Sequence, residues 1–264
     1  MQALHTAATG MAAQELSVQV ISNNLANLQT TGYKKQTAEF QDLIYQHIAR
    51  VGAQASQQGT ILPIGIDIGG GVKTVGTPRS MTQGTLSQTG NDLDLSITGE
   101  GFFKILMPDG TFQYTRDGTF QMDNTGRVVN AQGNPVQPTI TIPQNATGLS
   151  VNAQGQVSVQ LPGSSTTTST IVGTIGLTRF INKGGLMPVG NNNYTDTPSS
   201  GAPQDGTAAL EGYGNINQGS LENANVDVVS EMSNLIAAQR AYEMNAKVIT
   251  AADQMMQAAT ALFR

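Results

Sequence analysis

The side chains of this sequence that could carry out proton transfer are few and scattered. Asp92 and Asp94 alternate along a predicted strand, which would place both carboxylates on one side, as in a general acid and base pair. No cluster of His, Lys or Arg accompanies them in the sequence, so we favour a solvated or hydrogen-bonded strand face. The two carboxylates therefore give little support for an active site.

Metal binding and nucleophilic catalysis find equally little support. The chain has no cysteine, which removes thiolate zinc sites, cysteine nucleophiles and disulfides. Two histidines, His5 and His47, cannot form a three-histidine site. Residues 123–126 miss the EF-hand spacing, and the glycines at 69–71 lack the Gly-Lys-Ser/Thr of a phosphate-binding loop. We therefore expect no catalytic residue, no cofactor, no metal site and no enzymatic activity.

The composition disfavours further classes of protein. Charged residues make up only 12% of the 264 residues, and the formal net charge is −5. An acidic chain without a basic run is poorly suited to nucleic-acid phosphates, and no apolar run reaches the roughly 18 to 20 residues of a membrane span. The first lysine is Lys34, so the basic start of a secretory signal is missing. We expect no nucleic acid and no small-molecule substrate as partners, and either a cytosolic protein or export without cleavage.

The first 30 residues predict a helix. They contain no proline and a single glycine, Gly10, and apolar residues recur every seven positions in two interleaved series with one polar break at Gln14. The series comprise Leu4, Met11, Val18 and Leu25, and Ala7, Ile21 and Leu28. The pattern ends at 30–32, where Gly32 is expected to close the helix.

The last 40 residues predict a longer helix, from about 227 to 263. Asn225 or Asp227 is suited to cap its start. The surfaces around its narrow apolar stripe carry Ala, Gln, Asn and Met in place of Lys and Glu. We therefore expect the two terminal helices to pair with each other and to bury further faces against other copies of the chain. Two ordinary amphipathic helices of a globular core remain the alternative.

The middle of the chain, about 60 to 215, predicts β-structure. Turn residues separate short runs of β-branched and aromatic residues, and two hairpins are expected, at 102–115 and at 118–129. No residue from 128 to 178 is charged. This stretch is consistent either with a β-surface that contacts neighbours or with a tolerant region of Ser- and Thr-rich loops.

The predicted fold class is α+β: N- and C-terminal helices form a coiled-coil-like terminal domain, and a mainly-β middle domain is inserted between them. Residues 1–33 and 224–264 would form the helical domain, 34–90 and 203–223 an extended connecting domain, and 91–202 a β-rich outer domain. The expected assembly interface consists of Leu4, Met11, Val18, Ile21, Leu25, Leu28, Val228, Leu235, Tyr242, Ile249, Met256 and Phe263.

Several segments of this sequence resemble signatures of bacterial flagellar rod and hook proteins. They run Ser-Asn-Asn-Leu-Ala-Asn-Leu-Gln-Thr-Thr-Gly-Tyr-Lys at 22–34, Asp-Leu-Ser-Ile-Thr-Gly-Glu-Gly-Phe-Phe at 94–103, Tyr-Thr-Arg-Asp-Gly at 114–118, and a dispersed C-terminal motif at 225–243. The resemblance covers essentially the whole chain. The signature residues that it carries over are Asn23, Asn24, Leu25, Asn27, Thr31, Gly32, Gln239, Arg240 and Tyr242.

Within that family, the length of the chain and the segment 46–63 most resemble the distal-rod class. The resemblance implies a structural subunit that self-assembles into a rigid helical tube, transmits motor torque to the hook and passes exported subunits through its lumen, with segment 46–63 stiffening the tube. It further implies export through the flagellar type III apparatus without a cleaved signal peptide, and a place in the basal body where it crosses the periplasm.

The partners that this resemblance implies are other copies of the chain, proximal-rod proteins, the hook protein, the rod cap, and the outer-membrane and peptidoglycan ring proteins. A hook or proximal-rod subunit, which shares the signatures, remains an alternative. A cell-wall-associated enzyme is the alternative from a different class, but it would need a catalytic segment that the sequence does not display.

Overall fold

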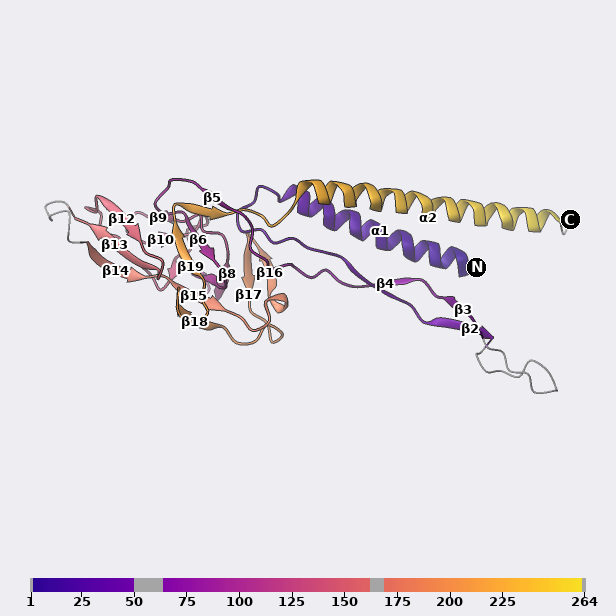
Figure 1. Cartoon of the computed structure of the whole chain (residues 1–264), viewed down its shortest axis with the longest axis horizontal. Coiled ribbons are helices and arrows are strands. Elements are labelled where there is room, and N and C mark those ends of the chain that lie inside the picture. Colours follow the sequence, from indigo (N-terminus) through magenta and orange to yellow (C-terminus); the bar gives the residue numbers. More distant parts are fainter. Residues whose placement is uncertain (1, 50–63, 162–168, 263–264) are drawn as a thin grey trace. The chain divides into compact units, whose positions relative to one another are not determined.

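The computed structural model describes residues 2–49, 64–161 and 169–262, and the chain divides into two compact units (Figure 1). The first unit comprises Met1–Leu25, Gln36–Pro78 and Asp227–Arg264, and the second comprises Ala26–Lys35 and Arg79–Val226. Helices lie at both ends of the chain and β-structure lies between them, so the predicted α+β layout is confirmed. The division into three domains, and a coiled-coil supercoil of the helices, stay predictions.

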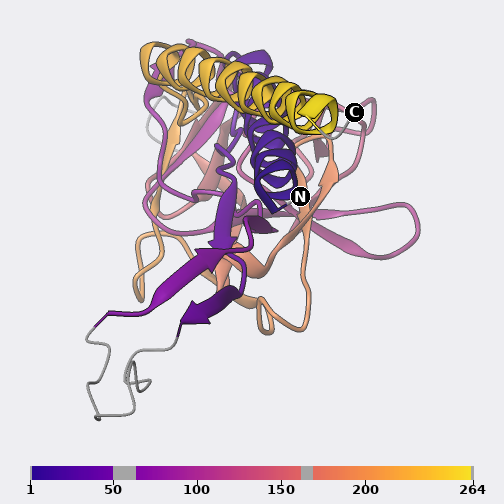
Figure 2. The same cartoon turned by 90° about the vertical axis from the view of Figure 1, so that its right-hand side faces the viewer.

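The first unit contains two long helices, α1 (Gln2–Ala26) and α2 (Val228–Leu262), which run side by side (Figure 2). Four short strands, in two antiparallel pairs, complete the described part of this unit. These pairs are β1 (Glu39–Asp42) with β4 (Val72–Gly76) and β2 (Tyr45–Ala49) with β3 (Ile66–Gly69). The hydroxyl of Thr9 on α1 accepts the Val72 amide at 3.3 Å, and this bond holds the start of β4 against α1.

The cap of the C-terminal helix follows the prediction, and the end of the N-terminal helix does not. Asp227 caps α2, since its carboxylate accepts the Val229 amide at 3.3 Å and the Ser230 hydroxyl at 2.6 Å. α1 ends at Ala26, six residues before Gly32, so the prediction that Gly32 closes this helix is wrong. A turn intervenes, in which the Thr30 amide donates to the Asn27 carbonyl at 3.1 Å.

Gly32 has a different reason to be glycine. Its φ is +67°, a left-handed conformation, and its amide donates to the Glu222 carbonyl at 2.7 Å. A Cβ at this position would lie 2.7 Å from the backbone nitrogen of Asp117. Gly32 therefore permits the close approach of three chain segments within the second unit.

The second unit is built on a seven-stranded sheet, in which six strands follow the order β16-β17-β8-β7-β15-β18 and β11 also pairs with β7. A three-stranded sheet, β12-β13-β14, and several two-stranded pairs complete it, and one short 3-10 helix, η1 (Lys183–Gly185), precedes β16. The strands are β5 (Leu86–Gln88), β6 (Leu95–Thr98), β7 (Phe102–Leu106), β8 (Phe112–Thr115), β9 (Gln121–Met122), β10 (Val128–Val129), β11 (Val136–Gln137), β12 (Gly148–Val151), β13 (Gln156–Gln160), β14 (Thr170–Thr174), β15 (Gly176–Arg179), β16 (Met187–Gly190), β17 (Asn193–Thr195), β18 (Gln204–Thr207), β19 (Asn215–Gln218) and β20 (Ser220–Glu222). Both predicted hairpins are confirmed, as the antiparallel pairs β7–β8 and β9–β10.

Side chains that alternate between the two faces of β7 contribute to two separate cores of this unit. Phe103 and Ile105 point to one side of the strand, and Phe103 joins a large aliphatic core. Phe102 points to the other side and packs edge-on against Phe180 and Tyr194, with ring centroids 6.0 Å apart in each case. The residues Phe102-Phe103 therefore supply both cores from adjacent positions.

Three hairpin turns of the second unit repeat one design, starting at Asp123, Asn130 and Asn152. In each, the side-chain oxygen of the first residue accepts the backbone amides two and four residues later. The fourth residue of each turn is a glycine with φ near +80°. The hydrogen bonds from Thr125 and Arg127 hold the pKa of the Asp123 carboxyl well below its usual range. The turns that start at Asn130 and Asn152 order part of the uncharged stretch 128–178 through neutral hydrogen bonds.

Candidate functional site

The aspartates that could have formed an acid and base pair do not share a strand face. Asp92 is exposed and lies in a turn, whereas Asp94 is buried and β6 begins only at Leu95. The Asp94 carboxylate accepts the Thr89 hydroxyl at 2.6 Å and the Asn91 amide at 3.1 Å. The shared face is therefore a wrong prediction, because a turn replaces the expected strand, and Asp94 serves to order that turn.

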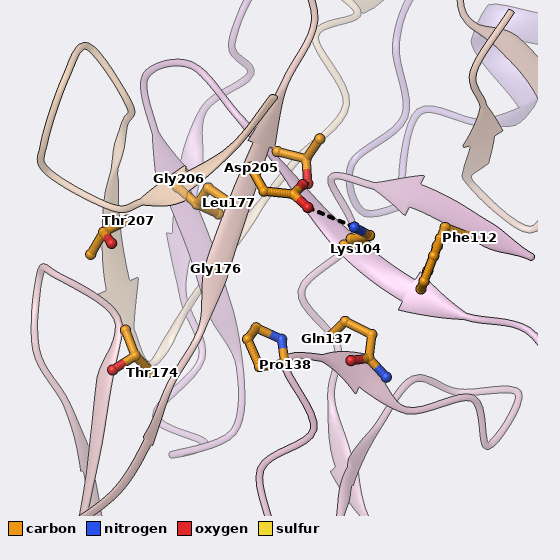
Figure 3. Close-up of a pocket in the computed structure, with 11 residues that line it drawn as sticks. Lys104, Phe112, Gln137, Pro138, Thr174, Gly176, Leu177, Asp205, Gly206 and Thr207 are labelled. Carbon is orange, nitrogen blue, oxygen red and sulfur yellow. Dashed lines mark hydrogen bonds and ion pairs between the residues drawn. The ribbon is translucent and has the colours of Figure 1, made fainter. Parts of the chain in front are cut away.

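A cavity of about 400 Å³ opens in the second unit between β7, β11, β15 and β18 (Figure 3). Its charged groups bond to each other: Lys104 Nζ lies 2.6 Å from Asp205 Oδ2, and the Thr178 hydroxyl donates to Asp205 Oδ1 at 2.5 Å. Partial burial raises the pKa of Asp205, but the hydrogen bonds from Lys104 and Thr178 outweigh it and hold the pKa below its usual value. An ionised, paired carboxylate stabilises the sheet and is a poor general acid.

The part of the chain that the structure describes also offers no metal centre and no membrane-spanning helix. No three side chains of the metal-ligating types gather within it. Neither of its two long helices has an apolar stretch that could cross a membrane. The paired terminal helices and the connections that anchor them are the remaining candidates for function.

The two terminal helices are antiparallel and keep a constant register. Near one end, the Asn24 amide donates to Glu231 Oε2 at 3.1 Å. Fourteen residues back along α1 and fourteen further along α2, a Cβ on Gly10 would lie 3.0 Å from Asn245 Nδ2. The register therefore does not slip between these points.

Small residues and one polar pair occupy the closest contacts of these helices. In α1 the buried positions are Ala7, Ala13, Val20 and Asn24. In α2 they are Glu231, Ala238 and Ala252. Asn24 also accepts the Gln36 amide at 2.9 Å and donates to the Gln36 carbonyl at 2.8 Å. The side chain of Asn24 thus joins α1, α2 and the chain that leaves α1.

The residues expected at the assembly interface lie beside these contacts. None of those that the structure describes is fully buried. Half-buried positions are Leu4, Met11, Val18, Ile21, Leu25, Leu28, Val228, Leu235 and Ile249. Tyr242 and Met256 are each 43% exposed, and Phe263 lies outside the described residues. Their burial between subunits stays a prediction.

The signature residues divide between the helices and the turn after α1. Thr31 is fixed in the second unit, because its hydroxyl donates to Asp117 Oδ1 at 2.9 Å and its carbonyl accepts the Asn192 amide at 2.9 Å. Asn27 accepts the Thr30 hydroxyl at 3.3 Å and so orders the turn. Residues on exposed or half-buried helix positions are Asn23, Leu25, Gln239, Arg240 and Tyr242. The structure thus gives a folding role to the turn residues, and the five helix residues just named are at least partly exposed.

A buried ionic cluster that the sequence analysis missed lies in the second unit. Lys34 Nζ is 2.5 Å from Glu222 Oε1, and Arg116 NH1 is 3.3 Å from Glu222 Oε2. The side chains of Lys34 and Glu222 are 0% exposed, and that of Arg116 is 4% exposed. Lys34 Nζ also donates to the Thr82 carbonyl at 2.8 Å, and Glu222 Oε1 accepts the Gly84 amide at 2.9 Å.

Burial and the neighbouring carboxylate act in opposite directions on the pKa of each cation in this cluster. Burial lowers the pKa of Lys34 and of Arg116, and the charge of Glu222 opposes this effect in both. Arg116 also donates to the Gly99 carbonyl at 2.6 Å and lies over the Phe102 ring, 5.4 Å from its centroid. The cluster therefore ties the chain just after α1 to the chain just before α2.

One signal in the sequence pointed to this cluster. Two of the segments that carry the family resemblance contain a cation of this cluster. Lys34 is the last residue of the segment 22–34, and Arg116 is the middle residue of the segment 114–118. In a chain with only 12% charged residues, a charge inside such a segment is a candidate for burial. Glu222 lies outside both segments, and no spacing connects it to Lys34 over 188 residues.

Comparisons with known proteins agree on one family. Residues 4–34 match the model described as flagella basal body rod protein, 96–159 the flagellar hook protein FlgE/F/G D1 domain, and 217–262 the flagellar basal body rod FlgEFG protein C-terminal region. Relatives named flagellar basal-body rod protein FlgG are 50% identical in Caulobacter vibrioides, over 99% of both chains, and 43% identical in Borreliella burgdorferi, over 100% of this chain and 99% of the relative. The FlgG of Bacillus subtilis is 36% identical over 97% of both chains. With such similarity over its full length, the chain belongs to the family of flagellar basal-body rod proteins.

Proposed function

We propose that this chain is the structural subunit of the flagellar distal rod. It self-assembles into a rigid helical tube that transmits motor torque to the hook and passes exported subunits through its lumen. The observation that carries the proposal is the pair of terminal helices, whose expected interface positions, among the residues that the structure describes, are all at least partly exposed in the single chain. Family membership supplies the setting in which other copies cover them.

The exposed apolar residues of α2 support burial between copies. Val229 is 73% exposed, Met244 61% and Met255 66%, and Met232 and Ile236 are each 50% exposed. Large apolar side chains repeated along one helix are typical of an interaction surface. If each copy offers one surface and receives another, the contact does not close on itself and generates a helical polymer.

We further propose that the chain reaches its place by the flagellar export route without cleavage and crosses the periplasm in the basal body. Its partners there are proximal-rod proteins, the hook protein, the rod cap and the ring proteins of the peptidoglycan and outer membrane. Segment 46–63, most of which lies outside the described residues, gives the tube its stiffness. Deletion of 46–63 is expected to yield a curved or flexible tube, whereas an unchanged straight tube would contradict this role.

The proposal is tested by the substitution Leu235→Asp. Leu235 is half-buried on α2, and a carboxylate there must stay hydrated, so polymer formation should be lost. Leu210→Asp is the matched control, because Leu210 is 56% exposed in the second unit. Sedimentation and electron microscopy measure assembly, and circular dichroism checks that the β-structure remains. Full assembly of Leu235→Asp would refute the role given to this helix.

A structural role also predicts that the chain does not cleave cell-wall glycan. Asp94 and Asp205, the carboxylates of the second unit first weighed for acid–base chemistry and found in the cavity, are bonded within a turn and a strand. Incubation with purified peptidoglycan should therefore release no muropeptides above a buffer blank. Release that depends on either aspartate would favour the enzyme alternative.

A further inference from the structure

The C-terminal end of α2 extends past the described part of α1. The constant register from Asn24–Glu231 to Gly10–Asn245 continues to place Gln2, where α1 begins, opposite residue 253. Residues 254–262 therefore have no partner on α1, and they extend about 13 Å beyond it at 1.5 Å per residue. Residues 253–261 are all exposed, including Met255 and Met256 at 66% and 43%. We call residues 254–262 the overhang.

A groove lies just before this overhang, within the same unit. It has a volume of about 640 Å³ and lies between the start of α1, the strand β3 and the middle of α2. The side chains that form its wall are small or apolar and comprise Ala3, Thr6, Ala7, Ile68 and Val248, together with Gly69 and two amides. None of the described residues that line it is charged.

The overhang and the groove match each other in chemistry. Residues 254–262 read Gln-Met-Met-Gln-Ala-Ala-Thr-Ala-Leu and carry no charge. Methionine is unbranched and flexible, so it fills an irregular apolar groove well, and the small residues beside it allow a second helix to approach closely. Neither surface would leave an ion buried without a partner when the two meet.

We propose that the overhang of one copy docks in the groove of a second copy of this chain. This inference rests on the proposed function, because it specifies a subunit contact within the polymer. The centres of groove and overhang are about 11 residues apart on α2, so two parallel copies must be offset by about 17 Å along the helix. Such a contact is heterologous, since each copy offers a different surface, and it propagates along the assembly.

The absence of cysteine from the sequence allows a clean crosslinking test on the full chain. Thr6→Cys places a thiol in the groove, and Met256→Cys places one on the overhang, and both positions are exposed. The two variants are prepared separately, mixed under reducing conditions, assembled and then oxidised. Because each copy carries one thiol, every disulfide joins two copies. Circular dichroism of each variant checks that the helices are retained.

The expected product is a dimer that joins position 6 to position 256, at least fivefold more abundant than either symmetric dimer. The matched control pairs Thr6→Cys with Gln132→Cys, which lies in an exposed turn of the second unit and should give only background. If filaments form and the mixed crosslink stays at background, or if the 256–256 dimer dominates, the docking is refuted while the proposed function stands. If neither filaments nor crosslinks form, both proposals fail.

Discussion

The buried ionic cluster predicts an order of destabilisation that depends on charge balance. Two cations, Lys34 and Arg116, share the single carboxylate of Glu222. Glu222→Gln leaves both cations buried without their counter-ion, and loss of one partner of a buried ion pair costs about 3–5 kcal/mol. We therefore expect Glu222→Gln to lower the free energy of unfolding of the second unit by at least that amount.

Lys34→Met should cost less than Glu222→Gln, although it removes the shorter of the two ion pairs. Arg116 and Glu222 remain as a neutral pair, and the Gly84 amide still donates to the carboxylate. The Thr82 carbonyl loses the hydrogen bond from the charged lysine, which costs about 1.5–3 kcal/mol, but it still accepts the Asn225 side-chain amide at 3.1 Å. The methionine side chain fills much of the volume of the lysine stem.

Urea unfolding monitored by the fluorescence of the buried tyrosines Tyr114 and Tyr194 measures these changes, because the chain has no tryptophan. Glu211→Gln is the matched control: Glu211 is exposed, and the expected change is within about 0.5 kcal/mol. The reasoning is refuted if Lys34→Met costs as much as Glu222→Gln, or if both change stability by less than about 1 kcal/mol.

Three further predictions concern the turn after α1, the cavity in the sheet and the helices. Gly32→Ala should destabilise the second unit by about 1–3 kcal/mol or more in urea unfolding, because φ is +67° and a Cβ would meet the Asp117 backbone; no change in midpoint would contradict the packing. Asp205→Asn should be less stable than the parent chain at neutral pH. Because the folded-state pKa of Asp205 is lowered, that difference should shrink as pH falls below about 4, and a difference that is constant in urea titrations from pH 7 to 3 would count against the ion pair. In dilute protein, the amides of α1 and α2 should exchange with deuterium faster than those of β7, β8 and β15, whereas equal protection would indicate helices that need no neighbours.

The helices of this protein could be predicted from sequence because their signal is local. Apolar residues recur every seven positions from Val228 to Met256, and α2 begins at Val228, beside the predicted cap Asp227. The hairpins β7–β8 and β9–β10 are local as well, since turn residues separate runs of β-forming residues. Such features depend on neighbours a few residues away.

The features that the sequence did not predict depend on distant contacts. Among the heptad positions within α1 only Ala7 is buried, whereas Ala13 and Val20, which lie outside the pattern, are buried as well. The approach of α2 and of the returning strands selects the buried face. Likewise Glu231 suits the first turn of a helix, but it is buried through its bond to Asn24, 207 residues away. Local propensity contains no information about such partners.

The ionic cluster also sets the order in which the chain can complete its fold. Lys34 lies near the amino terminus, and its partner Glu222 follows 188 residues later. Closing so long a loop is entropically unfavourable until the strands between them have formed and shortened the free chain. When the chain is released from its amino terminus onward, Lys34 therefore has no counter-ion with which to enter the core until β20, the last of the described strands, is available. Because Lys34 is buried together with Glu222, the second unit can complete its fold only when nearly the whole sequence is present.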